Sequence, residues 1–140
     1  MAVIDAKGLL LGRMCSEVAE RLLLGETIDI VNCEEAVISG DKYRIIRDFK
    51  RKREMGIPSK GPHYPKESFK IVKRTVRGML PYKREKGRKA FDRLKCYNTL
   101  PEAFRSKPTE TMEKANVDKL PNTKFVKVKH ISMIIGGKVE

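Results

Sequence analysis

The hydrophobic pattern changes period twice within the first third of the chain. Residues 2–6 form a short apolar stretch that ends in a glycine-containing turn. Between Gly12 and Gly25, apolar side chains recur every four residues among charged ones, which predicts an amphipathic helix that ends at Gly25. Residues 28–33 are largely β-branched and predict a buried strand. A strand, a helix and a strand in this order predict a βαβ unit, and therefore an α/β fold with parallel strands.

Two more helical patterns follow, with an irregular segment between them. A turn at residues 39–41 precedes a helix that begins near Lys42, and residues 68–80 resume helical spacing until Pro81 ends it. Residues 51–65 hold several glycines and prolines among basic side chains, so they predict an exposed, irregular loop without a core of its own. A loop of this length is usually functional or disordered.

The rest of the chain predicts shorter elements. Residues 83–89 form a basic, turn-rich stretch, and residues 94–97 a short strand. In the polar segment that follows, we expect one short helix at residues 110–115. Residues 125–129 alternate enough to predict a last strand, and residues 131–135 a last helical turn.

The composition limits the class of fold. A length of 140 residues is typical of one domain, so we expect a single domain over residues 1–140. Aromatic residues make up only 6% of the chain and Trp is absent, which disfavours the aromatic-rich layers of an all-β sandwich. The pattern and the composition therefore agree on a layered α/β domain with a modest aliphatic core.

Three features predict a cytoplasmic protein with no membrane partner. No apolar run approaches the roughly 20 residues that cross a bilayer. The first residues lack the basic start and apolar stretch of a secretory signal. The cysteines, Cys15, Cys33 and Cys96, are odd in number and widely spaced, which predicts reduced thiols rather than a disulfide framework.

Positive charge is concentrated in one segment. The chain has 31 Lys and Arg against 18 Asp and Glu, and residues 42–95 hold 20 of the basic residues with 5 of the acidic ones. This segment, the basic block, has a net charge of +15, whereas the other 86 residues together have −2. Each Lys or Arg that meets a phosphate releases a condensed counterion, so the block predicts a polyanionic partner. The alternative is a solvated face that only keeps the protein soluble.

Two motifs with possible chemistry are incomplete. Residues 8–13 resemble a phosphate-binding loop, but only three residues separate the glycines, and Arg13 and Met14 follow where a Walker loop has Lys and Ser or Thr. Ser39 and Lys42 have the spacing of a lysine-activated serine at a helix start, without the partner motifs of such enzymes. An ordinary βα turn and a helix cap explain the same residues.

The sequence also shows no pattern typical of a metal site. His63 and His130 are the only histidines, and no cysteine lies at metal-ligand spacing from another cysteine or a histidine. The acidic residues of the basic block are single and scattered, which does not suit two-metal nuclease chemistry. We therefore expect no catalytic residue, no metal, no cofactor and no small-molecule substrate.

Aromatic side chains are interleaved with the cations. Phe49, Phe69 and Phe91 lie at helical spacing and are expected in the core. Tyr64 and Tyr82 lie beside prolines in basic loops and are candidates for stacking on a base or ribose. No recognition-helix, zinc-finger or basic-zipper pattern is present, so structured RNA is a better expectation than sequence-specific duplex DNA.

Several segments together resemble a known family. They are residues 12–16 (Gly-Arg-Met-Cys-Ser), residues 30–32 with 39–42, and residues 76–81 (Val-Arg-Gly-Met-Leu-Pro) followed by Gly87 and residues 93–97. In this order and spacing they are similar to the L-thirteen family of large-subunit ribosomal proteins, over nearly the whole chain. The loop at residues 61–64 and the short C-terminal segment resemble the archaeal and eukaryotic branch.

The resemblance implies a fold and a function. The expected fold is a three-layer α/β/α arrangement around a mostly parallel sheet of about four strands, with an extended basic loop. The expected partners are large-subunit ribosomal RNA and neighbouring ribosomal proteins, without catalysis. By position in the motif, Arg77, Gly78 and Pro81 are expected to face RNA, and Met79 and Leu80 to pack inside.

The basic loops and the outer helix face complete the expected RNA-binding set: Lys50, Arg51, Lys52, Arg53, Lys60, His63, Tyr64, Lys66, Lys70, Lys73, Arg74, Arg77, Gly78, Pro81, Tyr82, Lys83, Arg84, Lys86, Arg88 and Lys89. Two other hypotheses stay open on the sequence alone. One is a small nucleic-acid-processing enzyme that uses Ser39 and Lys42 or the scattered acids. The other is a regulatory RNA-binding protein that acts away from the ribosome.

Overall fold

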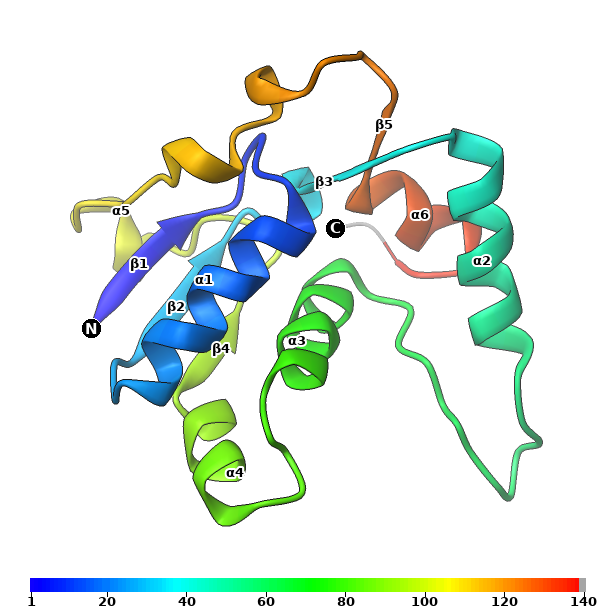
Figure 1. Ribbon diagram of the computed structural model, residues 1–140, viewed down its shortest axis with the longest axis horizontal. Coiled ribbons are helices and arrows are strands. Elements are labelled where there is room, and N and C mark those ends of the chain that lie inside the picture. The colour runs from blue at the N-terminus through cyan, green and yellow to red at the C-terminus, as the bar shows by residue number, and fades with distance from the viewer. Residues whose placement is uncertain (139–140) are drawn as a thin grey trace.

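The computed structural model describes residues 1–138, and a three-stranded parallel sheet lies at its centre. The strands are β1 (Ala2–Asp5), β2 (Ile28–Val31) and β4 (Leu94–Cys96), in the order β1-β2-β4 (Figure 1). Ile4 pairs in register with Ile30, and Ile30 with Cys96. The predicted βαβ unit is confirmed, because helix α1 (Leu11–Leu23) connects the first two of these strands.

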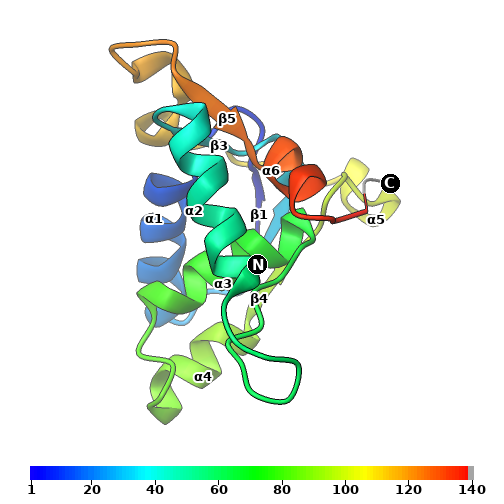
Figure 2. The same ribbon diagram turned by 90° about the vertical axis from the view of Figure 1, so that its right-hand side faces the viewer.

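Helices cover both faces of this sheet. On one face α1 packs against α3 (Ser68–Met79), and their apolar stripes enclose Ile4, Ile28 and Ile30. On the other face Phe104, from the four-residue helix α5 (Glu102–Arg105), packs against Val3 and Val31. Figure 2 shows α1 and α5 on opposite sides of the sheet. The α/β class and its layers are confirmed, with a thin second helical layer.

The strand count differs from the expected four. Strand β5 (Phe125–Lys127) pairs antiparallel with β3 (Val37–Ser39) in a separate two-stranded ribbon and does not extend the main sheet. The outer edge of β1 is already occupied, because Glu110 exchanges backbone hydrogen bonds with Val3 and Asp5 at 2.8 and 3.0 Å. A further strand could therefore pair along this edge only by displacing Glu110.

Helix α2 (Lys42–Glu54) stands beside this ribbon and helix α6 (Val128–Ile134), apart from α1 and α3 in Figure 1. The loop predicted from residue 51 begins only at Met55, so Arg51, Lys52 and Arg53 lie in the last helical turn. Lys and Arg are good helix formers, and the first residue that opposes the helix is Gly56, with a φ of 84°. The loop of residues 55–67 extends away from the body (Figure 1).

The turn predicted at residues 83–89 is also partly helical. Residues 85–89 belong to α4 (Glu85–Asp92), and only Lys83 and Arg84 stay outside it. The third residue of α4, Gly87, is buried against the backbone of Pro81 and Tyr82, where a Cβ atom would overlap the Pro81 carbonyl group. Glycine therefore marks a close helix contact here and not a turn.

Three 3₁₀ turns and the C-terminal helix complete the fold. Turn η1 (Cys33–Glu35) follows β2, and the helix expected at residues 110–115 is confined to η2 (Glu113–Ala115), followed by η3 (Val117–Lys119). The last strand ends at Lys127, because α6 begins at Val128 and not at residue 131. No helix within residues 1–138 has the length and apolarity needed to cross a bilayer.

The three cysteines are free thiols, as the sequence predicts. Cys15 and Cys33 are fully buried, and Cys96 is half-buried. Burial raises the pKa of the Cys15 thiol, and a hydrogen bond with Cys96 together with burial raises that of Cys33. Since the thiolate is the reactive form, both thiols are protected by access and by protonation.

We therefore expect a thiol reagent such as 5,5′-dithiobis(2-nitrobenzoate) at pH 8 to modify Cys96 alone, slowly, in the native protein, and all three cysteines in urea. Mass spectrometry of the digested adduct identifies the site. Native labelling of Cys15 as fast as in urea would contradict this packing.

Candidate nucleic-acid interface

Helix α3 presents cations on the side opposite its buried stripe. Ser68, Ile71, Val72 and Val76 are buried, and the predicted residues Lys70, Lys73, Arg74 and Arg77 lie on the other side. Three of these cations rest on aromatic rings: Lys70 lies 5.7 Å from the centroid of Phe69, Lys73 lies 4.9 Å from that of Phe91, and Arg77 lies 4.5 Å from that of Tyr82. The rings hold the cationic groups in place at the surface.

Phe69 and Phe91 were expected in the core and lie at its boundary. Both are half-buried and pack against buried residues, with the cations over their outer faces. Phe49 is buried as expected, at 8% exposure. These three phenylalanines therefore join the core to the charged surface.

Two adjoining hollows collect many of the predicted residues. The first, the α3 hollow, has a volume of about 200 Å³ and is lined by His63, Pro65, Lys70, Lys73, Arg74, Arg77 and Phe91. The second, the Tyr82 hollow, has about 420 Å³ and is lined by Arg77, Gly78, Leu80, Pro81, Tyr82, Lys83 and Arg84. Arg77 lines both, so the loop, the helix and the segment after it form one cationic strip.

The expectation that Met79 and Leu80 pack inside is correct for one of the two residues. Leu80 is buried at 6% exposure, whereas Met79 is 41% exposed. Met79 lies in the last turn of α3 on the side of Ser16, whose hydroxyl lies 3.6 Å from the Met79 sulfur. The helix ends before the chain turns inward at Leu80, so only the second of the two side chains reaches the core.

The end of α2 is tied to the basic loop. The ring of Tyr64 meets that of Phe49 edge to face at 5.9 Å, and the Lys52 ammonium lies 5.0 Å from the Phe49 centroid and 5.7 Å from that of Tyr64. Arg53 donates a hydrogen bond to the Tyr64 carbonyl at 3.3 Å. Burial raises the pKa of the Tyr64 hydroxyl. Tyr64 thus anchors the loop to α2, and Tyr82, at 37% exposure, is the more open of the two tyrosines proposed for stacking.

The other predicted residues lie around this strip. Lys60 closes a tight turn with Ile57 at the exposed end of the loop, and the Lys66 carbonyl accepts a hydrogen bond of 2.6 Å from Ser132 of α6. On α4, Lys89 pairs with Glu85 at 2.8 Å. The guanidinium of Arg88 donates to the Tyr82 carbonyl at 3.3 Å, so this side chain supports the preceding turn.

Helix α2 carries three further cations outside the predicted set. Lys42, Arg44 and Arg47 are exposed on α2, and Arg44, Arg47 and Arg51 follow one another at helical spacing. No ion pair involves any of them within the described residues. The spacing was visible in the sequence. What the sequence did not show is how little of α2 is buried, with Phe49 its only buried residue.

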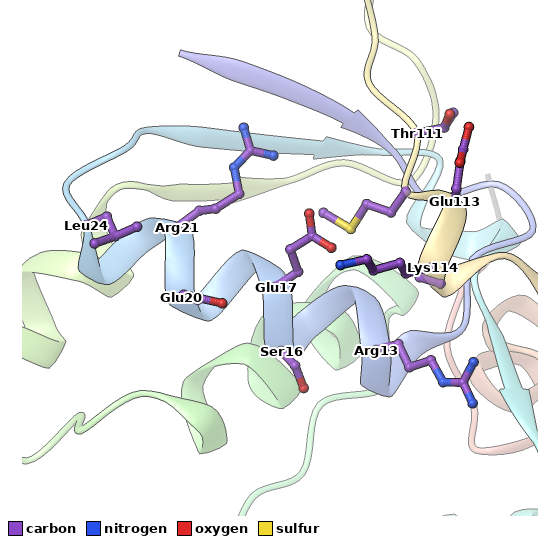
Figure 3. Close-up of a pocket in the computed structure, with 11 residues that line it drawn as sticks. Arg13, Ser16, Glu17, Glu20, Arg21, Leu24, Thr111, Glu113 and Lys114 are labelled. Atoms are coloured by element: carbon purple, nitrogen blue, oxygen red, sulfur yellow. The ribbon is translucent and has the colours of Figure 1, made fainter.

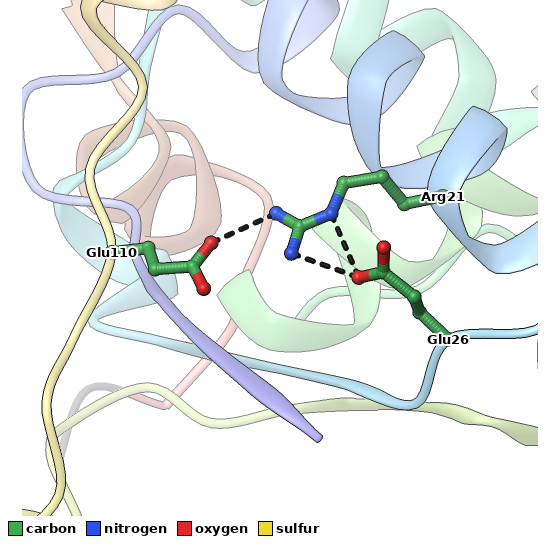
Figure 4. A network of polar contacts seen from close by, with 3 residues as sticks. All are labelled: Arg21, Glu26 and Glu110. Atoms are coloured by element: carbon green, nitrogen blue, oxygen red, sulfur yellow. Dashed lines mark hydrogen bonds and ion pairs between the residues drawn. The ribbon is translucent and has the colours of Figure 1, made fainter.

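Another hollow has a different character. It has a volume of about 810 Å³ and lies between α1 and η2, where acidic and basic side chains alternate, among them Arg13, Glu17, Glu20, Glu113 and Lys114 (Figure 3). Beside it, carboxylate oxygens of Glu26 and Glu110 lie 2.8 and 3.0 Å from the Arg21 guanidinium (Figure 4). These contacts raise the pKa of Arg21, with the hydrogen bond to Glu26 as the largest cause. The lining of this groove holds as many carboxylates as cations. Among the described cations of the α3 and Tyr82 hollows, only Lys70 has a carboxylate partner, Glu67 at 2.7 Å.

The incomplete motifs have structural roles. The backbone N–H groups of Gly8, Leu9 and Leu10 donate to carbonyls of Glu35, Ala6 and Ala115, so they are not free to cradle a phosphate. Ser39 ends β3 opposite Phe125, and Lys42 begins α2. Among residues 1–138, no three His, Cys, Asp or Glu side chains gather as metal ligands.

Comparison with known proteins identifies the family. The family profile described as Ribosomal protein L13 matches residues 1–103. The chain is 45% identical over 139 residues to the large ribosomal subunit protein uL13 of Methanosarcina barkeri, with 99% of each chain covered. The chain belongs to the ribosomal protein L13 family. It is also 44% identical to uL13 of Archaeoglobus fulgidus, with 96% of this chain and 86% of the relative covered. For uL13 of Methanocaldococcus jannaschii the identity is 42%, with 99% of each chain covered.

Membership in the L13 family decides against the enzyme hypothesis. Ribosomal protein L13 is a structural component of the ribosome and not an enzyme, which confirms the expectation of a chain without catalysis. The enzyme hypothesis built on Ser39 and Lys42 is therefore wrong. The archaeal relatives agree with the branch indicated by the loop at residues 61–64.

Proposed function

We propose that this chain binds and organises large-subunit ribosomal RNA, during subunit assembly and in the mature cytoplasmic ribosome, as one ribosomal-protein domain over residues 1–140. One observation carries the proposal: the basic block, with a net charge of +15, places cations at the surface of α2, the loop and α3. Ribosomal RNA supplies the phosphates that such a surface requires.

The mechanism is electrostatic. The α/β body holds the cations at fixed places, and each Lys or Arg that meets a phosphate releases a counterion. Arg adds a planar group that binds phosphate through two hydrogen bonds or stacks on a base, and Lys acts as a point charge. The nearly neutral remainder of the chain is left for neighbouring large-subunit proteins, the other expected partners.

Sedimentation of cell extract tests the proposal directly. A tagged copy of the chain is expected to travel with the large ribosomal subunit through a sucrose gradient at moderate salt and to be released at high salt. A copy found mainly in the soluble fraction, away from ribosomal particles, would instead favour a regulatory RNA-binding protein and contradict the proposed function.

The loop of residues 55–67 is expected to order on RNA. Residues 55–63 are all exposed, and the loop is anchored at its far end by Tyr64 and by the Lys66 carbonyl. Such a segment has little apolar surface to bury by itself. Amide hydrogen exchange is therefore expected to be fast in residues 55–63 of the free protein and slowed by ribosomal RNA. Strong protection without RNA would contradict this.

A further inference from the structure

The end of α3 carries a stacked group of planar side chains. The guanidinium of Arg77 lies 4.5 Å from the ring centroid of Tyr82, and the Tyr82 ring meets Phe91 edge to face at 5.5 Å and 84°. Phe91 packs against the core, so this group is held from below. Tyr82 nevertheless stays 37% exposed, and its surface opens into the Tyr82 hollow.

Gly78 forms part of the same hollow, and the fold gives no reason for a glycine there. It lies inside α3, is exposed, and a Cβ atom built on it would meet nothing within 4 Å. Glycine destabilises a helix relative to alanine, and here no internal contact requires it. Gly87 is the opposite case, because its neighbour Pro81 leaves no room for a side chain. The bare backbone at Gly78 is therefore suited to close approach from outside.

The lining of the Tyr82 hollow fits one class of ligand. Its volume of about 420 Å³ is within the range of small-molecule sites. Its lining includes the planar groups of Arg77 and Tyr82, the bare backbone of Gly78, and the cations Lys83 and Arg84. A nucleobase stacks on planar groups, and a phosphate binds to cations. Bases inside a paired helix are covered by their neighbours, so only an unpaired base offers a free face.

We infer that the Tyr82 hollow binds a single unpaired nucleotide of the ribosomal RNA. The base stacks on the Arg77–Tyr82 pair, the ribose passes over Gly78, and the phosphate meets Lys83 or Arg84. The inference rests on the proposed function, since the nucleotide belongs to the RNA that the basic block binds. It adds recognition of an unpaired base to an interface otherwise based on charge.

Two matched pairs of variants distinguish a loss of nucleotide binding in the hollow from a general effect of the substitution on the fold. The probe is a transcript of large-subunit ribosomal RNA. Tyr82→Leu is expected to weaken binding about tenfold, since stacking is lost, and to leave the salt dependence unchanged, since no charge is removed. Phe125→Leu removes a ring of similar exposure, 40%, from β5, and is expected to bind like the wild type.

The second pair separates stability from binding. Gly78→Ala and Gly12→Ala both place a methyl group on a helical glycine with nothing within 4 Å, so both are expected to raise the melting temperature. Only Gly78→Ala is expected to weaken RNA binding, by about threefold or more, because only there does the RNA approach the backbone.

Competition shows whether the bound base is unpaired. At equal phosphate concentration, single-stranded oligoadenylate is expected to displace the transcript from the wild type more effectively than a fully paired RNA duplex, and Tyr82→Leu is expected to lose this difference. If the wild type binds the transcript but Tyr82→Leu binds as tightly as Phe125→Leu, or Gly78→Ala as tightly as Gly12→Ala, the proposed nucleotide subsite is wrong and the proposed function still stands. A wild type that does not bind the transcript would overturn the proposed function itself.

Discussion

Replacing Arg44, Arg47 and Arg51 of α2 together by glutamine is expected to lower the affinity for large-subunit ribosomal RNA by about two orders of magnitude at 0.1 M salt. Each phosphate contact contributes about 0.8 to the magnitude of the slope of log K against log salt, so three contacts contribute about 2.4. At 0.1 M salt, a loss of about 2.4 from this magnitude corresponds to a loss of affinity of about 250-fold. The three side chains are exposed at helical spacing and form no ion pair in the described part of the chain.

Glutamine is nearly as good a helix former as arginine, so α2 is expected to keep its helical circular dichroism. The matched control replaces Lys114, Lys119 and Lys124 by glutamine, which removes the same charge from exposed positions outside the basic block. Filter binding of both triple variants measures the difference. Equal losses of affinity would show that only the net charge matters and that α2 is no part of the interface.

Gly87→Ala is expected to destabilise the protein, because overpacking a tightly fitted site usually costs about 1–3 kcal/mol. The added Cβ would overlap the Pro81 carbonyl group and lie 2.9 Å from the Tyr82 backbone nitrogen. Both partners are backbone atoms, so the turn from Pro81 to Arg84 has to move away from α4. Alanine also favours the helix, which offsets the cost by up to about 1 kcal/mol.

Thermal unfolding followed by circular dichroism measures this effect, and Gly78→Ala is the control. Both variants replace a helical glycine by alanine, yet Gly78 has open space above it. Opposite signs are therefore expected, with a lower melting temperature for Gly87→Ala and a higher one for Gly78→Ala. A rise in both variants would show that α4 does not rest on Pro81 as described.

The elements predicted well are those whose pattern is local. Residues 2–33 change from an apolar stretch to a helical period and back to an apolar stretch. This pattern is visible in consecutive residues, and the structure has β1, α1 and β2 at the corresponding places. The pairing partner of the last strand depends on a contact made by residues distant in the sequence. Backbone pairing of Glu110 with β1 closes that edge, and no property of residues 125–129 shows it.

Helix α4 was missed for a related reason. A glycine among basic residues is typical of a turn, and Gly87 is helical because α4 packs on Pro81, a tertiary contact. The same limit applies to Arg44 and Arg47, whose helical spacing is plain in the sequence. Their exposure follows from how α2 packs on α6 and β5, a tertiary arrangement that the spacing alone does not show.

The affinity of the purified chain for large-subunit ribosomal RNA over a range of salt concentrations tests the central claim most directly. If about eight phosphates are neutralised on mixed helical and single-stranded RNA, log K is expected to fall against log salt with a slope of about −6 to −7. A slope shallower than about −2 would mean that few of these cations meet phosphate, and would contradict the account.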